Sequence, residues 1–238
     1  HRPQQFSADG TRICFAASSD LEVGGEYLYD RKRAKLNELA VIRPAVDPEL
    51  MTPVKQITFN ARDGLLLHGY LTLPRGREAK NLPLIIHPHG GPYTIRDEWR
   101  YDSEVQFYAN RGFAVLQIDY RGSGGYGREF EASGYKKWGL EMQNDLSDGV
   151  KWAVDQGLAD PARVVISGAS YGGYAAMAGL TLTPELYCAG INYVGVTDIE
   201  ILIPKAQTEE RMYWRHTRLG NLGESGDKKR IHDTSPVN

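Results

Sequence analysis

The chain has 238 residues, a formal net charge of −2, 41% hydrophobic residues and 24% charged residues. These values are typical of a globular protein with a sizeable core, and the balanced charge predicts neither nucleic acid nor an anionic membrane as a partner. No apolar run approaches the ~18 residues of a membrane span. The two cysteines, Cys14 and Cys188, form no metal or redox motif, so we expect them to pack as small apolar residues.

Both ends are expected to lie inside a longer protein. The chain begins at His1 without a methionine, so its N-terminus predicts no compartment, although the cytoplasm is our default expectation. The last residues, 235–238, are typical of the start of a new helix or loop.

Residues 1–46 predict short strands joined by turns. The run 11–16 is rich in β-formers, and 26–30 alternates apolar and polar residues before a basic turn at 31–35. One such unit cannot bury its own face, so we expect it to belong to a larger β array. Residues 43–53 contain three prolines and predict a linker.

After the linker the pattern changes to alternating strands and helices. The predicted strands are 56–60, 65–73, 83–87, 113–119, 163–167 and 189–196, and the predicted helices are 102–110, 141–156 and 171–182. Strands separated by helices of this length predict a mainly parallel sheet with helices on both faces. The sequence therefore predicts an α/β fold for residues 47–238.

A nucleophile motif lies between the predicted strand 163–167 and the predicted helix 171–182. Residues 168–172 read Gly-Ala-Ser-Tyr-Gly, which is the Gly-x-Ser-x-Gly elbow of the α/β-hydrolase fold. The elbow holds its serine on a sharp turn, and the glycines leave room for the crowded strand and helix. Ser170 is therefore the candidate nucleophile, and the alternative is a tight turn with a buried serine.

A second glycine motif, His-Gly-Gly-Pro at 89–92, follows an earlier predicted strand. Acyl transfer needs two backbone N–H donors for the oxyanion that develops on the substrate. One is the N–H of Tyr171, after the nucleophile, and the other comes from this loop. We choose the N–H of Gly91 as the second donor, with that of Gly90 as the near alternative. The alternative to any oxyanion role is that 89–92 forms an ordinary turn.

Two other patterns suggest cofactors or metals. The glycines of 122–127 match the dinucleotide-binding fingerprint, but Tyr120 and Arg121 separate them from the preceding strand, so we expect no cofactor. His87 and His89 could face the same side of a strand as half of a metal site. No Cys or His elsewhere completes a ligand spacing, so we expect no metal.

These motifs together resemble the prolyl oligopeptidase family of serine peptidases, particularly its acylaminoacyl-peptidase-like branch. The resemblance covers residues 50–238 and rests on the stretches 61–64, 68–71, 89–92, 119–127, 168–174 and 235–238, which stand in the family's order. It implies that 1–46 is the last blade of a β-propeller. It also implies that 47–238 is an α/β-hydrolase peptidase domain that lacks its last strands.

The resemblance implies cleavage of short peptides through an acyl-enzyme on Ser170. It also places the catalytic Asp and His beyond Asn238. Because serine is a weak nucleophile without an adjacent base, the chain as it stands is expected to be nearly inactive.

An internal base is the alternative source of activation. His216 and His232 follow the elbow, and Asp198 or Asp227 could precede them in the order Ser, acid, His. Asp198 comes one strand too early and His232 lies in a charged stretch, so we expect both histidines to be surface residues.

Three competing functions remain at this point. An esterase would use the same elbow and loop, and a catalytically silent hydrolase fold would use them only for binding. A nicotinamide-dependent reductase would rest on 122–127 alone. For the peptidase, the expected partner is a short peptide substrate, with self-association left open.

Overall fold

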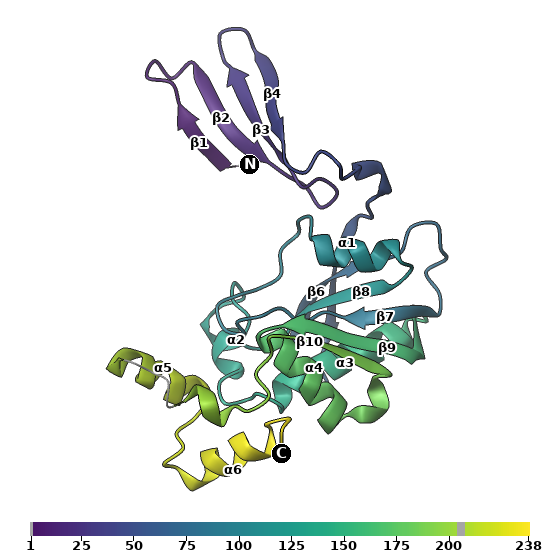
Figure 1. The fold of residues 1–238 in the computed structure, drawn as a ribbon, viewed down its shortest axis with the longest axis vertical. Coiled ribbons are helices and arrows are strands. Elements are labelled where there is room, and N and C mark those ends of the chain that lie inside the picture. The colour runs from purple at the N-terminus through teal and green to yellow at the C-terminus, as the bar shows by residue number, and fades with distance from the viewer. Residues whose placement is uncertain (1, 204–207) are drawn as a thin grey trace.

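The computed structural model describes residues 2–203 and 208–238, which form two β-sheets (Figure 1). A four-stranded sheet with the order β1-β2-β3-β4 comes first, and a six-stranded sheet with the order β10-β9-β7-β8-β6-β5 follows. Within these residues, no helix has both the length and the apolar character needed to cross a membrane.

The N-terminal sheet is an antiparallel meander, the arrangement of a propeller blade. Its strands are β1 (Arg2–Phe6), β2 (Arg12–Ala17), β3 (Gly25–Asp30) and β4 (Lys35–Val41). The sequence predicted β2 and β3 but missed the two outer strands. In β4, Glu38 pairs with Tyr27 and Ala40 pairs with Glu26, so Leu39 is an extra residue in a bulge. The bulge breaks the period-2 alternation by which a strand is recognised.

The second sheet is mixed and carries the predicted strands. The pairs β7–β8, β7–β9 and β9–β10 are parallel, whereas β5–β6 and β6–β8 are antiparallel. Its strands are β5 (Val54–Asn60), β6 (Leu66–Thr72), β7 (Leu82–Ile86), β8 (Ala114–Asp119), β9 (Ala159–Ala169) and β10 (Ala189–Tyr193).

Helices cover both faces of this sheet. Figure 1 shows α1 on the side that faces the N-terminal sheet, and α3 and α4 on the opposite side. The helices are α1 (Ser103–Asn110), α2 (Arg128–Ser133), α3 (Glu141–Asp155), α4 (Tyr171–Leu182), α5 (Glu209–Arg218) and α6 (Ser225–Asp233), with short 3-10 turns η1 (Pro48–Leu50), η2 (Pro184–Leu186) and η3 (Glu200–Leu202).

The core lies between the sheet and α3 and α4. Met142, Leu146 and Val150 recur every four residues on α3 and are almost fully buried. Gly149 lets the helix approach β8 closely, because a Cβ at that position would lie 2.2 Å from the Ile118 side chain.

A buried polar contact joins the two sheets. The Asp20 carboxylate, in the loop after β2, accepts a hydrogen bond from the Val54 N–H (2.8 Å). The Gln106 amide, on α1, donates to the carbonyl oxygens of Asp20 (3.2 Å) and Thr52 (2.8 Å). Since all these groups are buried, the N-terminal sheet is fixed to α1 by directional bonds as well as by the linker.

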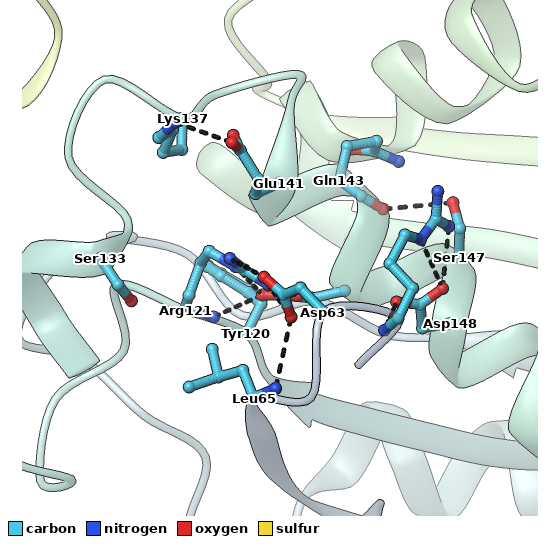
Figure 2. Close-up of polar contacts among 12 residues, drawn as sticks. Asp63, Leu65, Tyr120, Arg121, Ser133, Lys137, Glu141, Gln143, Ser147 and Asp148 are labelled. Carbon is cyan, nitrogen blue, oxygen red and sulfur yellow. Dashed lines mark hydrogen bonds and ion pairs between the residues drawn. The ribbon is translucent and has the colours of Figure 1, made fainter. Parts of the chain in front are cut away.

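Arg121 joins three elements at the end of β8. Its guanidinium donates to Asp145 on α3 (2.9 and 2.7 Å) and to Asp63 in the β5–β6 turn (2.8 and 3.2 Å). Figure 2 shows Arg121 reaching Asp63. A second ion pair joins Arg62 to Asp148 (2.8 Å). The Arg121 side chain is 8% exposed, whereas that of Arg62 is 55% exposed.

We expect Arg121→Met to destabilise the intact protein far more than Arg62→Met. Loss of Arg121 leaves the Asp145 carboxylate buried without its cation, which costs about 3–5 kcal/mol. Loss of the exposed Arg62 removes a pair of a kind that contributes about 0–1 kcal/mol. Urea unfolding of both variants measures the difference, and equal losses would contradict this view of the Arg121 network.

Candidate active site

Ser170 lies at the sharp turn between β9 and α4. Its backbone angles are φ 56° and ψ −117°, a region that non-glycine residues rarely adopt. Two backbone bonds hold it there: the Ser170 N–H donates to the Tyr193 carbonyl on β10, and the Ser170 carbonyl accepts from the Tyr174 N–H, each at 3.0 Å. The residue is exposed, so the turn presents its hydroxyl outside the core.

The two glycines of the elbow lie against the backbone at the end of β7. A Cβ at Gly172 would lie 2.2 Å from the Pro88 carbonyl oxygen, and one at Gly168 would lie 2.8 Å from the same atom. Both distances are shorter than any contact that a real Cβ makes, so only glycine fits at these two positions. The crowding that the motif implies therefore comes from Pro88, the residue just before the glycine loop, by which we mean residues 89–92.

The glycine loop lies directly beside the nucleophile. A Cβ at Gly90 would be 3.5 Å from the Ser170 Cβ. Gly91 has φ +121°, which a side chain rarely adopts, and a Cβ there would be 3.0 Å from Ile95. Within residues 2–203 and 208–238, neither the Gly91 N–H nor the Tyr171 N–H donates a hydrogen bond. Both donors named from the sequence are thus free and come from segments that meet at Ser170.

His89 belongs to a buried polar cluster with Asp97 and Asp119, in which one ligand atom from each residue lies within 4.8 Å of the others. The His89 ring is already bonded on both sides, by the Gly90 carbonyl oxygen (2.7 Å) and the Ser123 hydroxyl (2.8 Å). The Asp119 oxygens accept from the Asp97 N–H (2.8 Å) and the Tyr126 hydroxyl (2.5 Å). The cluster is thus a hydrogen-bonded network, in which most of the atoms that could bind a metal ion already have a hydrogen-bond partner.

His87 points elsewhere, so the two histidines of the 87–89 pair do not converge. The Nδ1 of His87 lies 2.9 Å from the Ser167 carbonyl oxygen on β9. Among the described residues, His87 is not part of the group of side chains that could hold a metal ion together. Alternation along the chain stops where β7 ends at Ile86, which removes the basis for placing both rings on one side.

Burial changes the titration of this cluster. The pKa of Asp97 is raised to about 8. Burial is the main cause, and the negative charge of the nearby Asp119 carboxylate is the second. Burial lowers the pKa of His89 from its usual 6.5, and the hydrogen bond to the Gly90 carbonyl opposes this more weakly. A lowered pKa favours the uncharged form of the His89 imidazole.

In the part of the chain that the structure describes, the internal acid and base candidates make no hydrogen bond to Ser170. His232, on α6, is 59% exposed and lies 3.5 Å from Asp233. The Asp227 carboxylate is bonded to Lys136 and Arg230. Among the described residues, no histidine makes a hydrogen bond to the Ser170 hydroxyl.

The glycines of 122–127 have a packing role. The Gly124 N–H donates to the Ile95 carbonyl (2.8 Å), and a Cβ at Gly124 would lie 2.4 Å from the Thr94 carbonyl oxygen. α2 begins directly afterwards but spans only residues Arg128–Ser133. The loop therefore packs against the segment that follows the glycine loop.

A cavity of about 180 Å³ adjoins Gly91. Its lining is mainly aromatic and apolar, with two arginines at one side; it comprises Gly91, Pro92, Tyr93, Trp138, Leu202, Trp214, Arg215, Arg218 and Leu219. Neither this cavity nor the cluster around His89 was predicted from the sequence. The one local signal was Asp119, an acidic residue at the end of an apolar strand.

We expect Gly172→Ala to abolish the elbow geometry, because its Cβ would overlap the Pro88 carbonyl. The matched control is Gly226→Ala on α6, where a Cβ meets nothing within 4 Å. The control should be neutral or slightly stabilising, since alanine favours a helix by about 1 kcal/mol over glycine. Thermal unfolding and reaction with a serine-directed probe distinguish the two, and a wild-type probe rate in Gly172→Ala would contradict the crowding argument.

Asp97 should make stability fall with rising pH. Because its pKa is raised from 3.8 to about 8 by burial, the folded protein binds this proton more tightly than the unfolded chain does. The contribution is complete below about pH 4 and is lost as pH rises towards 8, at up to about 1.4 kcal/mol per pH unit. Asp97→Asn should remove this loss, so the variant gains on wild type between pH 5 and 8. Urea unfolding at several pH values measures this difference in stability between Asp97→Asn and wild type. A difference that does not change with pH would rule the effect out.

Comparison with known proteins places this geometry in a family. Residues 99–238 match the prolyl oligopeptidase family. The dipeptidyl aminopeptidase BIII of Pseudoxanthomonas mexicana is 36% identical over 220 residues, covering 89% of this chain and 32% of the relative. The dipeptidyl peptidase family member 6 of Caenorhabditis elegans is 31% identical, covering 83% of this chain and 30% of the relative. The chain thus spans about a third of the length of these curated relatives.

Solved structures agree with the sequence relatives. A puromycin hydrolase superposes with a TM-score of 0.81 at 25% identity, covering 96% of this chain and 35% of that structure. The acylaminoacyl peptidase of Pyrococcus horikoshii superposes with a TM-score of 0.78 at 25% identity, covering 99% and 37%. These likenesses confirm the predicted α/β-hydrolase fold preceded by a blade-like sheet. With more than half of its residues matching the family, this chain belongs to the prolyl oligopeptidase family.

Proposed function

We propose that the intact protein is a serine peptidase that cleaves short peptides through an acyl-enzyme on Ser170. The observation that carries this proposal is the backbone of Ser170, held at φ 56° on an exposed turn between β9 and α4. A binding module has no need to hold a serine in such a conformation, whereas a nucleophile gains access from it.

The proposed reaction proceeds in two steps. The Ser170 Oγ adds to the scissile carbonyl carbon, a base takes the hydroxyl proton, and the C–N bond breaks as the amine leaves with that proton. Water then hydrolyses the ester and restores the serine. The negative charge on the carbonyl oxygen is stabilised by the N–H groups of Tyr171 and Gly91, which are free in the described structure.

The base and its orienting acid are proposed to come from residues that follow Asn238. In support, the described histidines make no hydrogen bond to Ser170, and serine needs an adjacent base. The edge strand β10 also exposes apolar side chains, with Ile191 47% and Tyr193 69% exposed, as expected if more protein covers that edge. On this proposal residues 1–46 end a propeller, 47–238 form the peptidase domain without its last strands, and the isolated chain is nearly inactive.

The proposed substrate is a short peptide with an apolar residue beside the scissile bond. The cavity next to Gly91 is lined by Trp138, Leu202 and Trp214, which would favour an apolar side chain. The names of the relatives, a dipeptidyl aminopeptidase and an acylamino-acid-releasing enzyme, support short peptides with a free or an acylated N-terminus.

We expect a fluorophosphonate probe to label Ser170 in the intact protein and Ser170→Ala to abolish both labelling and turnover, the latter by about a thousandfold or more. Ser167→Ala is the matched control, since Ser167 is a buried serine on β9 whose hydroxyl contacts Tyr108. Mass spectrometry of the adduct gives the site. An adduct that persists in Ser170→Ala, or a folded wild type that is never labelled, would refute the proposal. Turnover of matched peptide and ester substrates distinguishes a peptidase from an esterase.

A further inference from the structure

A second cavity, of about 340 Å³, lies over strands β5 and β6, away from the apolar cavity beside Gly91. The proposed reaction uses none of its residues. The side chains that line it are mostly polar, and no carboxylate of the described chain is among them. The polar and aromatic members are Gln56, Thr58, His68, Tyr70, Arg96 and Tyr126. The cavity therefore carries the positive charge of one arginine.

The strand register places this cavity level with the nucleophile. Strands β8 and β9 both pair in parallel with β7 and end at the same level, with Asp119 and Ala169 as their last residues. On β6, His68 lies opposite Asp119. β6 is the third strand from β9 in the sheet, and neighbouring strands lie about 4.8 Å apart. His68 is therefore about 14 Å across the sheet from the end of β9, where Ser170 follows.

The cavity opens on the face of the sheet that α3 does not cover. Ile118 on β8 packs against α3, so its neighbours Gln117 and Asp119 point to the other face. Tyr70 lies opposite Gln117 and His68 lies opposite Asp119, and residues directly opposite share a face. The N-terminal sheet lies on this same side of the second sheet (Figure 1). The lining side chains thus point away from the core and are open to a ligand.

The polar groups of this cavity have no partner within residues 2–203 and 208–238. The Arg96 guanidinium makes no hydrogen bond or ion pair there, and the side chains of Gln56, Thr58 and Tyr70 make no hydrogen bond. Tyr70 is 9% exposed, yet its hydroxyl is not among the enclosed atoms. A buried ring with an open hydroxyl places a donor at the cavity wall. Several free donors therefore converge beside one free cation.

Arg96 is held at the cavity by an aromatic wall. Its guanidinium lies 6.0 Å from the centre of the Tyr126 ring, which stacks on His68 at 4.3 Å. A Cβ at Gly125 would lie 2.5 Å from the Arg96 Nη1, so the glycine leaves space for the guanidinium. The Asp119 carboxylate is bonded to the Tyr126 hydroxyl (2.5 Å) and makes no ion pair with Arg96. The charge of Arg96 is thus in place without an acidic partner.

From this arrangement we propose that the cavity binds a carboxylate of the peptide substrate, about four residues from the scissile bond. A guanidinium binds a carboxylate through two parallel hydrogen bonds, and the hydroxyls of Thr58 and Tyr70 can donate to the remaining lone pairs. An extended chain advances about 3.4 Å per residue, so four residues span the 14 Å from Ser170. The inference rests on the proposed function and adds to it a charged group that the substrate carries away from the reacting bond.

Matched peptides and the intact protein test the proposal. One pair differs only in a C-terminal acid or amide, and the other in Glu or Gln, each placed four residues from the scissile bond. We expect the wild type to prefer the acid in at least one pair by about ten- to a hundredfold in kcat/KM, the effect of a charge-assisted hydrogen bond. The pair that responds identifies the carboxylate as terminal or as a side chain. The preference should lie in KM, since the interaction is the same before and during reaction.

The variants assign the preference to this cavity. Arg96→Gln should abolish it, and Tyr70→Phe should reduce it by about fivefold, as for one neutral hydrogen bond. Arg100→Gln is the matched control, because Arg100 lies in the same segment but pairs with Glu98 (3.8 Å) and does not line the cavity. The ratio between acidic and neutral peptides is insensitive to a general loss of folded protein. A preference that survives in Arg96→Gln, or that Arg100→Gln also abolishes, would overturn the proposal.

The wild type alone separates this inference from the proposed function. A folded wild type without turnover or fluorophosphonate labelling overturns the proposed function, and the inference falls with it. An active wild type that treats both members of each pair alike overturns the inference alone.

Discussion

The strained turn at Ser170 is the constraint on which the arrangement of this site depends. A non-glycine residue at φ 56° costs about 1–3 kcal/mol, so the surrounding structure must over-determine it. The Tyr193 carbonyl on β10 and the first turn of α4 hold the two ends of the residue. The Pro88 carbonyl, packed against Gly168 and Gly172, leaves no space for the turn to relax towards β7. Three neighbouring strands thus have to be in register before the serine can take this conformation.

A second set of contacts starts from consecutive residues at the end of β8. Asp119 bonds to Asp97 and Tyr126, Tyr120 stacks on His89, and Arg121 reaches across to α3 and the β5–β6 turn. Since these groups are largely buried, each must find a polar partner within the protein. Satisfying all of them fixes the glycine loop and the 122–127 loop relative to the sheet. The rigidity of the proposed oxyanion site is thus supplied by a strand that contributes no reacting group.

Local patterns were sufficient to predict the parts of this structure that repeat or have a fixed spacing. The spacing of Leu146, Val150, Trp152 and Val154 predicted α3. The elbow motif predicted a strand–turn–helix at 168–172. The helices α2, α5 and α6 and the outer strands of the N-terminal sheet were missed, since short charged stretches and a bulge hide the period. The His89 network was missed for a different reason. His89, Asp97, Asp119 and Ser123 have no common spacing, and only the packing of two loops brings them together.

The position of the N-terminal sheet is also linked to the nucleophile through buried contacts. Asp20 is bonded to Gln106 on α1. Two residues further along α1, the Tyr108 hydroxyl lies 3.0 Å from the Ser167 hydroxyl on β9. Ser167 precedes Ser170 by three residues in the strand that ends at the elbow. The bonds made by Asp20 and Gln106 are buried, so breaking them would leave buried polar groups unpaired at about 1–3 kcal/mol each. Any displacement of the N-terminal sheet must therefore either break these bonds or carry α1 with it, and α1 is hydrogen-bonded through Tyr108 to the strand that leads to the serine.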